Sequence, residues 1–246
     1  MKYKGENKKF DRSHHSVIRL LLLFFIPFIV YSVSFIPSVL LIGSYLHYAL
    51  LFFSHWIIPL IILPFVLFIS FFLLVLSVMF FTGMTIKFFH LSYEPGEYSK
   101  SIKDKNTFHY ALYYVLYRPT AKLVTVIFFP PLYAMYLRMV GARLGKQVFF
   151  GERTTISDPC VCEIGDRSLI GGGVTIMGHL GEDKLIIKKV KIEDHCLIGA
   201  ESLIMPGVHM KHHSIVGGKS LVTKNKVLES HTIYGGVPVQ VIKKNK

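Results

Sequence analysis

The sequence predicts a membrane α-helical hairpin followed by an all-β domain, a left-handed parallel β-helix. Two observations support this fold class. No Asp, Glu, Lys or Arg occurs between Leu20 and Ile86, which is long enough for two membrane crossings. From Leu144 onward, large apolar side chains recur every six residues, a period that is typical of parallel β-helices.

The composition agrees with a membrane protein. Of the 246 residues, 52% are hydrophobic and only 17% are charged, whereas a soluble domain carries about 25% charged residues. The net charge of +13 fits anionic lipid and the phosphates of an acidic cofactor. We expect no nucleic-acid partner, because the basic residues flank the apolar block and form no aromatic-interleaved strip.

The apolar block at 18–87 is expected to form the hairpin. A membrane-spanning helix needs about 20 apolar residues, so we expect two spans, near 18–45 and 56–85; three tight spans are the alternative. Lys and Arg lie in the basic N-terminus, 1–17, and after the block, but not in the connecting turn. The positive-inside rule then places both termini in the cytoplasm, with the chain integral to the cytoplasmic membrane.

The segment 88–143 is a connector with two open interpretations. The aromatic run from Tyr110 to Tyr117 is amphipathic, and the apolar run from Val124 to Val140 is interrupted by prolines. These runs predict either interfacial helices that lie on the bilayer or helices that pack under the C-terminal domain.

The C-terminal domain, 144–246, carries the six-residue repeat. Its large apolar positions are Leu144, Phe150, Ile156, Ile164, Ile170, Ile176, Ile192, Ile198, Ile204, Met210, Val216 and Val222. The next residue is often glycine, and the residue four positions on is small or β-branched. Three such hexads close a triangular coil, with the large side chain inside and the small one at the corner. We expect the glycines to relieve turns that need a positive φ.

Two breaks interrupt the period. A short corner insertion lies between Ile156 and Ile164, and a longer loop protrudes at 177–191. Loops on a rigid scaffold are where functional residues tend to lie, so the loop at 177–191 is the first place to look for a site.

The closing segments resemble a known superfamily. The stretches beginning at Ile198, at Ile215 and at Tyr234 resemble the end of sugar and antibiotic O-acetyltransferases of the hexapeptide-repeat superfamily. The resemblance implies a homotrimer, acetyl-CoA or another acyl-CoA in the groove between neighbouring coils, and a histidine base. Maltose and galactoside acetyltransferases have that histidine two residues after a coil glycine, where this chain has Glu201. A base must therefore come from elsewhere.

A second resemblance indicates where. The membrane-bound C-terminal domain of poly-lysine-synthetase-type peptide synthetases has a His-Leu-Phe-Glu-Asp-Arg loop, similar to the stretch from His179 to Lys184, in which Gly181 replaces the Phe. The segments 95–98 and 158–166 are also similar to that family. The resemblance covers roughly 90–225.

His179 is accordingly the candidate general base, since a neutral imidazole can accept the proton of an attacking hydroxyl or amine. Asp183 or Glu182 is expected to hold its tautomer, as carboxylates do for catalytic imidazoles. The alternative is a surface histidine on a loop that only packs subunits together. The other candidate histidines are His195, His209, His212, His213 and His231.

The acyl-CoA is expected along the coil edge. Ala200, Gly217, Gly218 and Lys219 would let pantetheine approach the backbone, while Lys219, Thr223 and Lys224 would meet phosphates. Solubility is the alternative role for the lysines. No metal site is expected, because the positions that hold histidine in γ-carbonic anhydrases are Ala200 and Pro206 here. Cys160, Cys162 and Cys196 are expected to be reduced structural thiols.

These observations predict a membrane-anchored, acyl-CoA-dependent O- or N-acyltransferase, with acetyl as the expected acyl group. Its acceptor would be a lipid-linked or small molecule near the membrane. Two alternatives stay open: a non-catalytic β-helix scaffold in a membrane biosynthetic complex, and a peptide-bond-forming partner of a synthetase.

Overall fold

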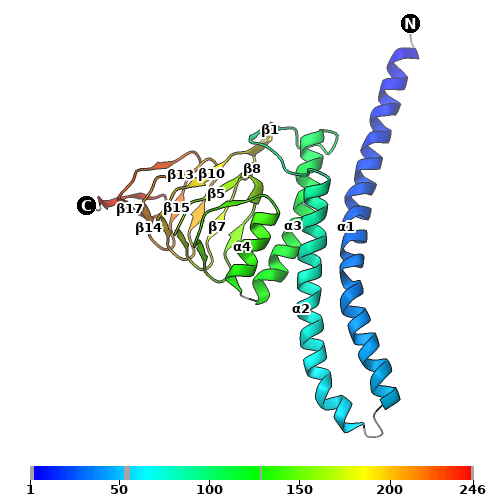
Figure 1. The fold of residues 1–246 in the computed structure, drawn as a ribbon. Helices are drawn as coiled ribbons and strands as arrows, with labels where there is room; N and C mark the ends of the chain where they lie inside the picture. The colour runs from blue at the N-terminus through cyan, green and yellow to red at the C-terminus, as the bar shows by residue number, and fades with distance from the viewer. Residues whose placement is uncertain (1–2, 53–55, 128, 245–246) are drawn as a thin grey trace.

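The computed structural model describes residues 3–52, 56–127 and 129–244. Two long helices, α1 (Tyr3–Phe52) and α2 (Ile57–Phe88), form a hairpin beside a C-terminal β domain (Figure 1). Both helices extend beyond the expected spans of 18–45 and 56–85. Their apolar parts, Val17–Phe52 and Ile57–Phe88, are long and apolar enough to cross a membrane.

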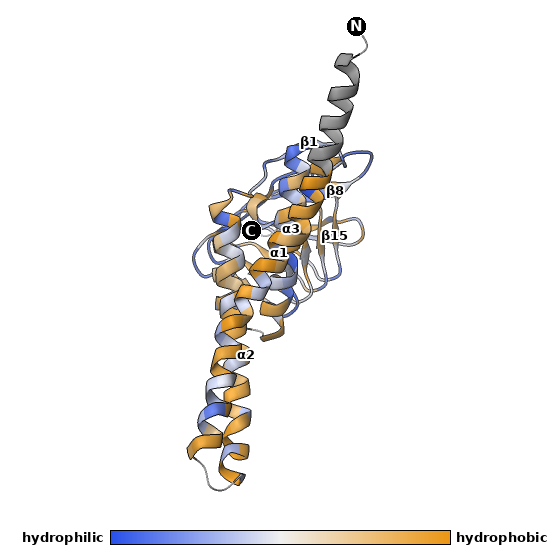
Figure 2. Ribbon diagram, turned by 90° about the vertical axis from the view of Figure 1, so that its right-hand side faces the viewer, coloured by the Kyte–Doolittle hydropathy of each residue, from blue (hydrophilic) through white to orange (hydrophobic). Residues whose placement is uncertain are grey.

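The hairpin is apolar along most of its length (Figure 2), with one polar contact at its centre. The hydroxyl of Ser38 donates to the carbonyl of Ser70 at 2.9 Å, and the Ser70 hydroxyl donates back to the Ser38 carbonyl at 3.2 Å. Both serines are buried. Small residues of this kind let two helices approach closely and join through hydrogen bonds that lipid cannot replace.

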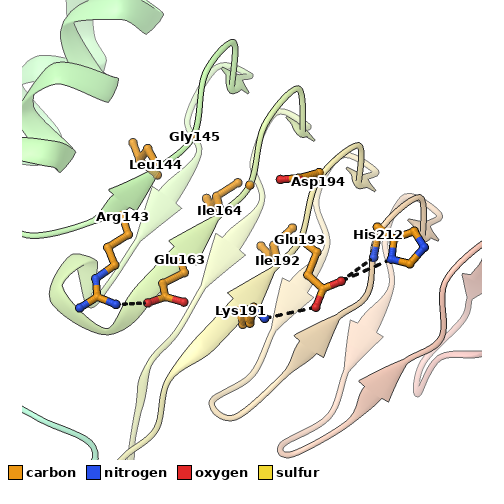
Figure 3. Close-up of a pocket in the computed structure, with 11 residues that line it drawn as sticks. Arg143, Leu144, Gly145, Glu163, Ile164, Lys191, Ile192, Glu193, Asp194 and His212 are labelled. Carbon is orange, nitrogen blue, oxygen red and sulfur yellow. Dashed lines mark hydrogen bonds and ion pairs between the residues drawn. The ribbon is translucent and has the colours of Figure 1, made fainter.

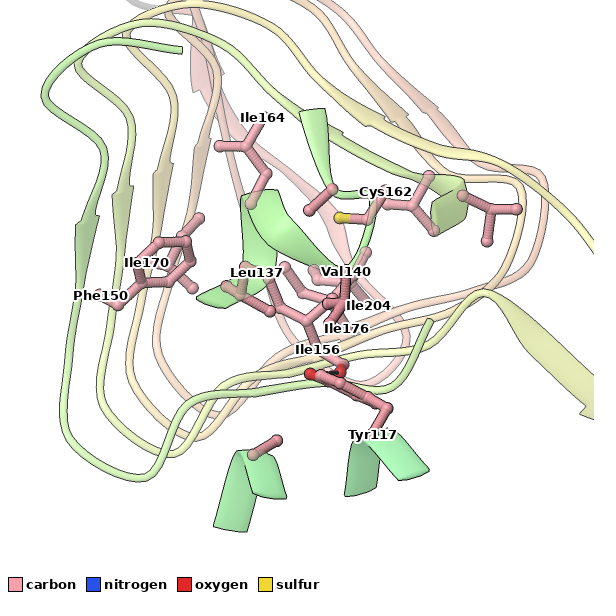
Figure 4. Close-up of a cluster of buried hydrophobic side chains, with 14 of the residues drawn as sticks. Tyr117, Leu137, Val140, Phe150, Ile156, Cys162, Ile164, Ile170, Ile176 and Ile204 are labelled. Atoms are coloured by element: carbon pink, nitrogen blue, oxygen red, sulfur yellow. Dashed lines mark hydrogen bonds between the residues drawn. The ribbon is translucent and has the colours of Figure 1, made fainter. Parts of the chain in front are cut away.

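The connector forms α3 (Lys105–Ile127) and α4 (Pro130–Met139). The helix α4 lies over the open end of the β coil, and α3 lies at its edge beside Ile156 (Figure 4). The Tyr117 hydroxyl donates to the carbonyl of Ile156 at 2.6 Å, and the Tyr113 hydroxyl donates to that of Val140 at 2.8 Å. Tyr113, Tyr117 and Leu137 are completely buried. Of the two interpretations of this segment, packing under the C-terminal domain therefore accounts for these side chains.

The β domain is a coil of short parallel strands with three faces, which confirms the parallel β-helix. The first face contains β2 (Arg143–Leu144), β5 (Cys162–Ile164), β10 (Val190–Ile192), β13 (His209–Met210) and β16 (Val227–Leu228). The second contains β3 (Phe149–Phe150), β6 (Leu169–Ile170), β11 (Leu197–Ile198), β14 (Ile215–Val216), β17 (Thr232–Gly235) and the antiparallel β18 (Gln240–Lys244). The third contains β4 (Thr155–Ile156), β7 (Thr175–Ile176), β12 (Leu203–Ile204) and β15 (Leu221–Val222).

The residues that repeat every six positions pair with one another between successive coils. Ile164 pairs with Ile192, Ile170 with Ile198, and Ile176 with Ile204. Every repeating apolar position from Phe150 to Val222 is buried. The small corner residues are largely buried too, and their hydroxyls bind the backbone: Ser202 donates to the carbonyl of Gly217 at 2.9 Å.

The glycines have a different role from the one expected. A positive φ occurs three residues after the buried apolar residue, mostly at non-glycine residues such as Arg167 (φ 53°), His195 (φ 56°) and His213 (φ 55°). The glycines that directly follow the apolar residue lie under the next coil. A Cβ on Gly171 would lie 2.7 Å from the backbone nitrogen of Ala200. These glycines therefore permit close stacking of coils and do not relieve the turn.

The two segments that break the period lie close together at one corner of the coil. The first contains a short 3₁₀ turn, η1 (Pro159–Val161). The loop expected to protrude at 177–191 is a β-hairpin, β8 (His179–Gly181) and β9 (Leu185–Ile187). The strand β1 (Gly96–Tyr98) adds to it in antiparallel register, with Gly96 opposite Ile187. The three segments quoted for the second resemblance thus meet at one corner of the coil.

Candidate active site

The structure pairs His179 with Asp158. The imidazole Nδ1 lies 2.7 Å from Oδ2 and 2.9 Å from Oδ1 of the carboxylate. His179 begins β8, directly after the third face, and Asp158 lies in the corner insertion one coil earlier. The two breaks in the repeat therefore supply one residue each to the pair.

The carboxylate of Asp158 is held by further donors. The Tyr93 hydroxyl donates to Oδ1 at 2.7 Å, and the backbone N–H of Gly178 donates to Oδ2 at 2.7 Å. Asp158 is only 1% exposed. A buried carboxylate without such partners would be costly, so these bonds stabilise the charge and fix its orientation towards His179.

The arrangement selects one tautomer of His179. An ionised carboxylate only accepts hydrogen bonds, so Nδ1 carries the proton and Nε2 presents a lone pair. Among the described residues, Nε2 has no hydrogen-bond partner. The side chain is 23% exposed, and Nε2 is therefore the nitrogen that can take a proton from a bound molecule.

Aromatic side chains from α3 surround the imidazole. The ring of Tyr110 meets that of His179 edge-on at 5.3 Å, and the ring of Tyr114 does so at 6.2 Å. Arg118 lies 5.5 Å from the centre of the Tyr114 ring. Burial, followed by the negative charge of Asp158, raises the pKa of Tyr110. Tyr110 therefore stays a neutral hydroxyl, and it does not compete with His179 as a base.

The carboxylates expected to orient His179 lie elsewhere. Glu182 is ion-paired with Lys224 at 2.6 Å, and Asp183 is exposed at the turn of the hairpin. Both residues are in the turn between β8 and β9, at the end of the hairpin opposite the His179–Ile187 pair. The partner of His179 is Asp158, in place of Asp183 or Glu182.

The residues expected to bind acyl-CoA occupy two corners of the coil. Ala200, Gly217, Gly218 and Lys219 lie between the second and third faces, where Lys219 is 3.5 Å from Glu201. Thr223 and Lys224 lie at the corner of the hairpin. Within one chain, the first set and His179 are thus on different corners.

The other candidate histidines lie on or beside the first face. His209 contacts Glu193 at 2.7 Å. His195, His213 and His231 stack with ring centres 4.7 and 4.9 Å apart at the corner between the first and second faces, and His212 meets two of them edge-on. None of these corner histidines has a carboxylate arranged as Asp158 is.

A hollow of about 740 Å³ lies over the first face (Figure 3). Its outward side chains form a charged ladder, in which Arg143 pairs with Glu163 at 2.7 Å and Lys191 with Glu193 at 3.2 Å. The charges in this ladder are already matched by one another. We therefore place the candidate site at His179 and not in the hollow.

Sequence reasoning missed Asp158 as the partner of His179. A signal was present, because the insertion Ser157-Asp158-Pro159 interrupts the six-residue period and carries an acidic side chain. Tyr93 and Tyr110 gave no such signal, because their places beside the coil depend on how the segment before β1 and the helix α3 pack.

Comparison with known proteins supports the repeat. The family model of the hexapeptide repeat of succinyl-transferase matches residues 189–223. The match covers the later coils and leaves out the hairpin of β8 and β9 and the helices. No curated protein sequence matches the chain.

Several solved structures are similar to part of this chain. A maltose O-acetyltransferase from Clostridium difficile is 20% identical, with a TM-score of 0.43, over 62% of this chain and 94% of its own. An acetyltransferase from Vibrio cholerae, bound to acetyl coenzyme A, is 19% identical with a TM-score of 0.42, over 52% and 87%. A galactoside acetyltransferase with coenzyme A is 19% identical with a TM-score of 0.40, over 52% and 80%. Likenesses this distant assign no activity to this chain.

Proposed function

We propose that this protein is a membrane-anchored acyltransferase that uses an acyl-CoA, with His179 as its general base. The observation that carries the proposal is the buried Asp158 carboxylate, which binds Nδ1 of His179 and leaves Nε2 free to accept a proton. A histidine oriented in this way by a carboxylate is suited to deprotonating a nucleophile.

The chemistry requires one proton to be moved twice. Nε2 takes the proton of the acceptor hydroxyl or amine as its oxygen or nitrogen attacks the thioester carbonyl. The tetrahedral intermediate then collapses, the carbon–sulfur bond breaks, and the thiolate of CoA takes the proton from the imidazolium. The negative charge of Asp158 stabilises the imidazolium between the two steps.

An acyl-CoA as donor agrees with the hexapeptide-repeat match and with the CoA-bound acetyltransferases to which the coil is similar. Ala200 and Gly218 are exposed and Gly217 is half-buried, so together they offer a side-chain-poor edge for the pantetheine arm. Because this edge is not at the corner of His179, a homotrimer is part of the proposal: a neighbouring copy would bring its edge to His179. Light scattering of the detergent-purified protein tests it, and a monomer would contradict it.

The anchor is the α1–α2 hairpin, with both termini in the cytoplasm, where CoA is found. It would keep the catalytic domain beside acceptors that are themselves in or near the membrane. An amine acceptor, and with it peptide-bond formation, is the alternative within the same chemistry.

Turnover of acetyl-CoA by the detergent-purified protein tests the proposal. Thiol release is followed with a panel of hydroxyl and amine acceptors, for the wild type and for His179→Ala. Loss of a general base is expected to lower kcat by about 10²–10⁴-fold. His209→Ala, on the first face, is the matched control and should keep its activity.

The outcomes separate the alternatives. Equal turnover by the wild type and His179→Ala would contradict the role of His179 but not the acyltransferase. A wild type that neither turns over nor binds acetyl-CoA would contradict the enzyme and favour the scaffold.

A further inference from the structure

The corner where α3 ends and α4 begins exposes apolar side chains that the rest of the chain does not cover. Val126 is 73% exposed and Phe129 is 53% exposed. Pro131, on the first turn of α4, is exposed as well. We call these three residues the α3–α4 corner. Most other apolar side chains of α3 and α4 are buried or half-buried; Val115 and Met135, at 40% and 50% exposed, are exceptions.

The corner lies on the side of the hairpin turn. In Figure 1, the junction of α3 and α4 is the part of the C-terminal domain that reaches furthest towards the turn between α1 and α2, and α4 rises away from it. Whatever surrounds the lower part of the hairpin therefore comes nearest to the β domain at this corner.

Contacts between α4 and α2 show how far the α3–α4 corner lies from the turn of the α1–α2 hairpin. Met139, at the end of α4, packs on Gly83 of α2, and the Tyr136 hydroxyl lies 3.1 Å from the Thr82 hydroxyl. Gly83 is about 40 Å along α2 from Ile57, at 1.5 Å per residue. The 10 residues of α4 span about 15 Å. The corner is then about 25 Å from the hairpin turn, which is less than the roughly 30 Å of a bilayer's hydrocarbon core.

Charges mark the upper boundary of the exposed apolar surface. On α3, the exposed Lys122 lies one turn above Val126. On α4, the exposed Arg138 lies two turns above Pro131, and its guanidinium donates to the carbonyl of Gly145 at 2.7 Å. Arg153, beside Phe129, is 3.9 Å from Glu152. Apolar tips below a level of long cationic side chains are typical of segments inserted into a membrane surface, where Lys and Arg extend to the headgroups.

We propose that the α3–α4 corner inserts into the near leaflet of the bilayer that the hairpin spans, with Val126 and Phe129 among the acyl chains. The proposal rests on the membrane anchoring that belongs to the proposed function. It adds a third contact with the membrane, and this contact sets the orientation of the coil. Tyr114, which touches His179, is about 18 Å along α3 from Val126. The site would therefore face acceptors whose reacting group extends well beyond the headgroups.

Tryptophan fluorescence tests the insertion, because the chain has a single tryptophan, Trp56. The full-length protein is reconstituted into bilayers of lipids brominated on their acyl chains, which quench tryptophan on contact. The variants carry Trp56→Phe with either Phe129→Trp or Val126→Trp. The matched control carries Trp56→Phe with Val227→Trp, an exposed apolar position on the first face. Thermal unfolding checks that each variant is folded.

The expected result is loss of most of the fluorescence at 129 and 126, with little loss at 227. Quenching at 129 and 126 no stronger than at 227 would overturn the proposal. Unquenched, blue-shifted emission that depends on the protein-to-lipid ratio would assign the corner to a second copy and would also overturn it. A further variant, Trp56→Phe with Phe68→Trp at an exposed position in the middle of α2, separates the two proposals. If 68 is quenched and 129 is not, the anchoring stands and only the insertion fails; if 68 is not quenched, the anchoring fails.

Discussion

At the scale of the residue, the site depends on one buried carboxylate. Asp158 accepts hydrogen bonds from Tyr93, from the backbone of Gly178 and from His179. Its burial makes each of these bonds strong, because water does not compete for the carboxylate. The bonds from Tyr93 and Gly178 hold the Asp158 carboxylate in place. The bond from His179 to this fixed carboxylate then orients the imidazole.

Replacing Asp158 by Asn tests this role. The amide can accept from Nδ1–H through its oxygen, but it no longer stabilises the imidazolium. We expect the proposed transferase activity to fall by about 10²–10⁴-fold while CoA binding is kept. Asp183→Asn, at the exposed turn of the hairpin, is the control and should be as active as the wild type. A loss in Asp183→Asn and none in Asp158→Asn would return the role to the hairpin carboxylate. Circular dichroism verifies that Asp158→Asn is folded.

At the scale of the element, the coil is stabilised by close stacking and by its outward ladders. Glycines such as Gly171 let successive coils approach until their backbones touch. On the first face, outward side chains of opposite charge pair between coils, as Arg143 does with Glu163. The stacking of successive coils is therefore stabilised both by close contact of their backbones and by ion pairs on the outer surface.

Gly171→Ala is expected to destabilise the coil. The added Cβ would lie 2.7 Å from the backbone nitrogen of Ala200, and neither backbone can move without disturbing a ladder of hydrogen bonds. Overpacking of this kind costs about 1–3 kcal/mol, which chemical denaturation in detergent would measure. Gly181→Ala is the matched control, since its Cβ would meet nothing within 4 Å. Equal stabilities of the two variants would contradict the stacking role.

The first face also predicts a pH dependence. The hydrogen bond from His209, with further bonds from the His212 backbone and Lys191, lowers the pKa of Glu193 from 4.5 to about 2. Because this folded-state pKa is below the unfolded value, the stabilisation is present above about pH 4.5 and is lost as the pH falls towards about 2. Glu193→Gln should melt at a lower temperature than the wild type at about pH 5, and the difference should shrink on acidification. A constant difference down to pH 2 would contradict this linkage.

At the scale of the whole molecule, the hairpin and the coil are joined by α3 and α4. Arg19 of α1 donates to the carbonyl of Ile102 at 3.0 Å, and the Tyr31 hydroxyl donates to that of Leu116 at 2.8 Å. The upper half of α2 packs on the same helices through Val75, Met79 and Ile86. The β domain is thus packed on the hairpin and not attached by a free linker.

The proposed topology can be tested in intact cells. Single cysteines replace Trp56 and Val227 in a background without native cysteines, and a membrane-impermeant maleimide is added. We expect labelling at 56 in intact cells, and at 227 only after permeabilisation, because the positive-inside rule places the basic segments in the cytoplasm. Labelling of 227 in intact cells would contradict the proposed orientation.

The sequence by itself determined the elements that depend on local pattern. A charge-free run predicts a helical hairpin, because a helix satisfies its own backbone wherever it lies. A six-residue period predicts the coil, because each hexad repeats the same strand and corner. The prediction included the inward positions from Phe150 to Val222, and it singled out His179 through its loop.

Only the tertiary structure decided which residues meet. Asp158 and His179 come from different breaks in the repeat, and coil stacking brings them together. Tyr110 joins them through the packing of α3, and Tyr93 joins them through the segment between α2 and β1; no period in the sequence specifies either placement. The expected role of the glycines was wrong for the same reason. Residues that touch between successive coils are far apart in the sequence, whereas a local pattern reports only on residues that are near one another in the sequence. The exposed α3–α4 corner is likewise visible only once the packing of α3 and α4 has buried most of their other apolar side chains.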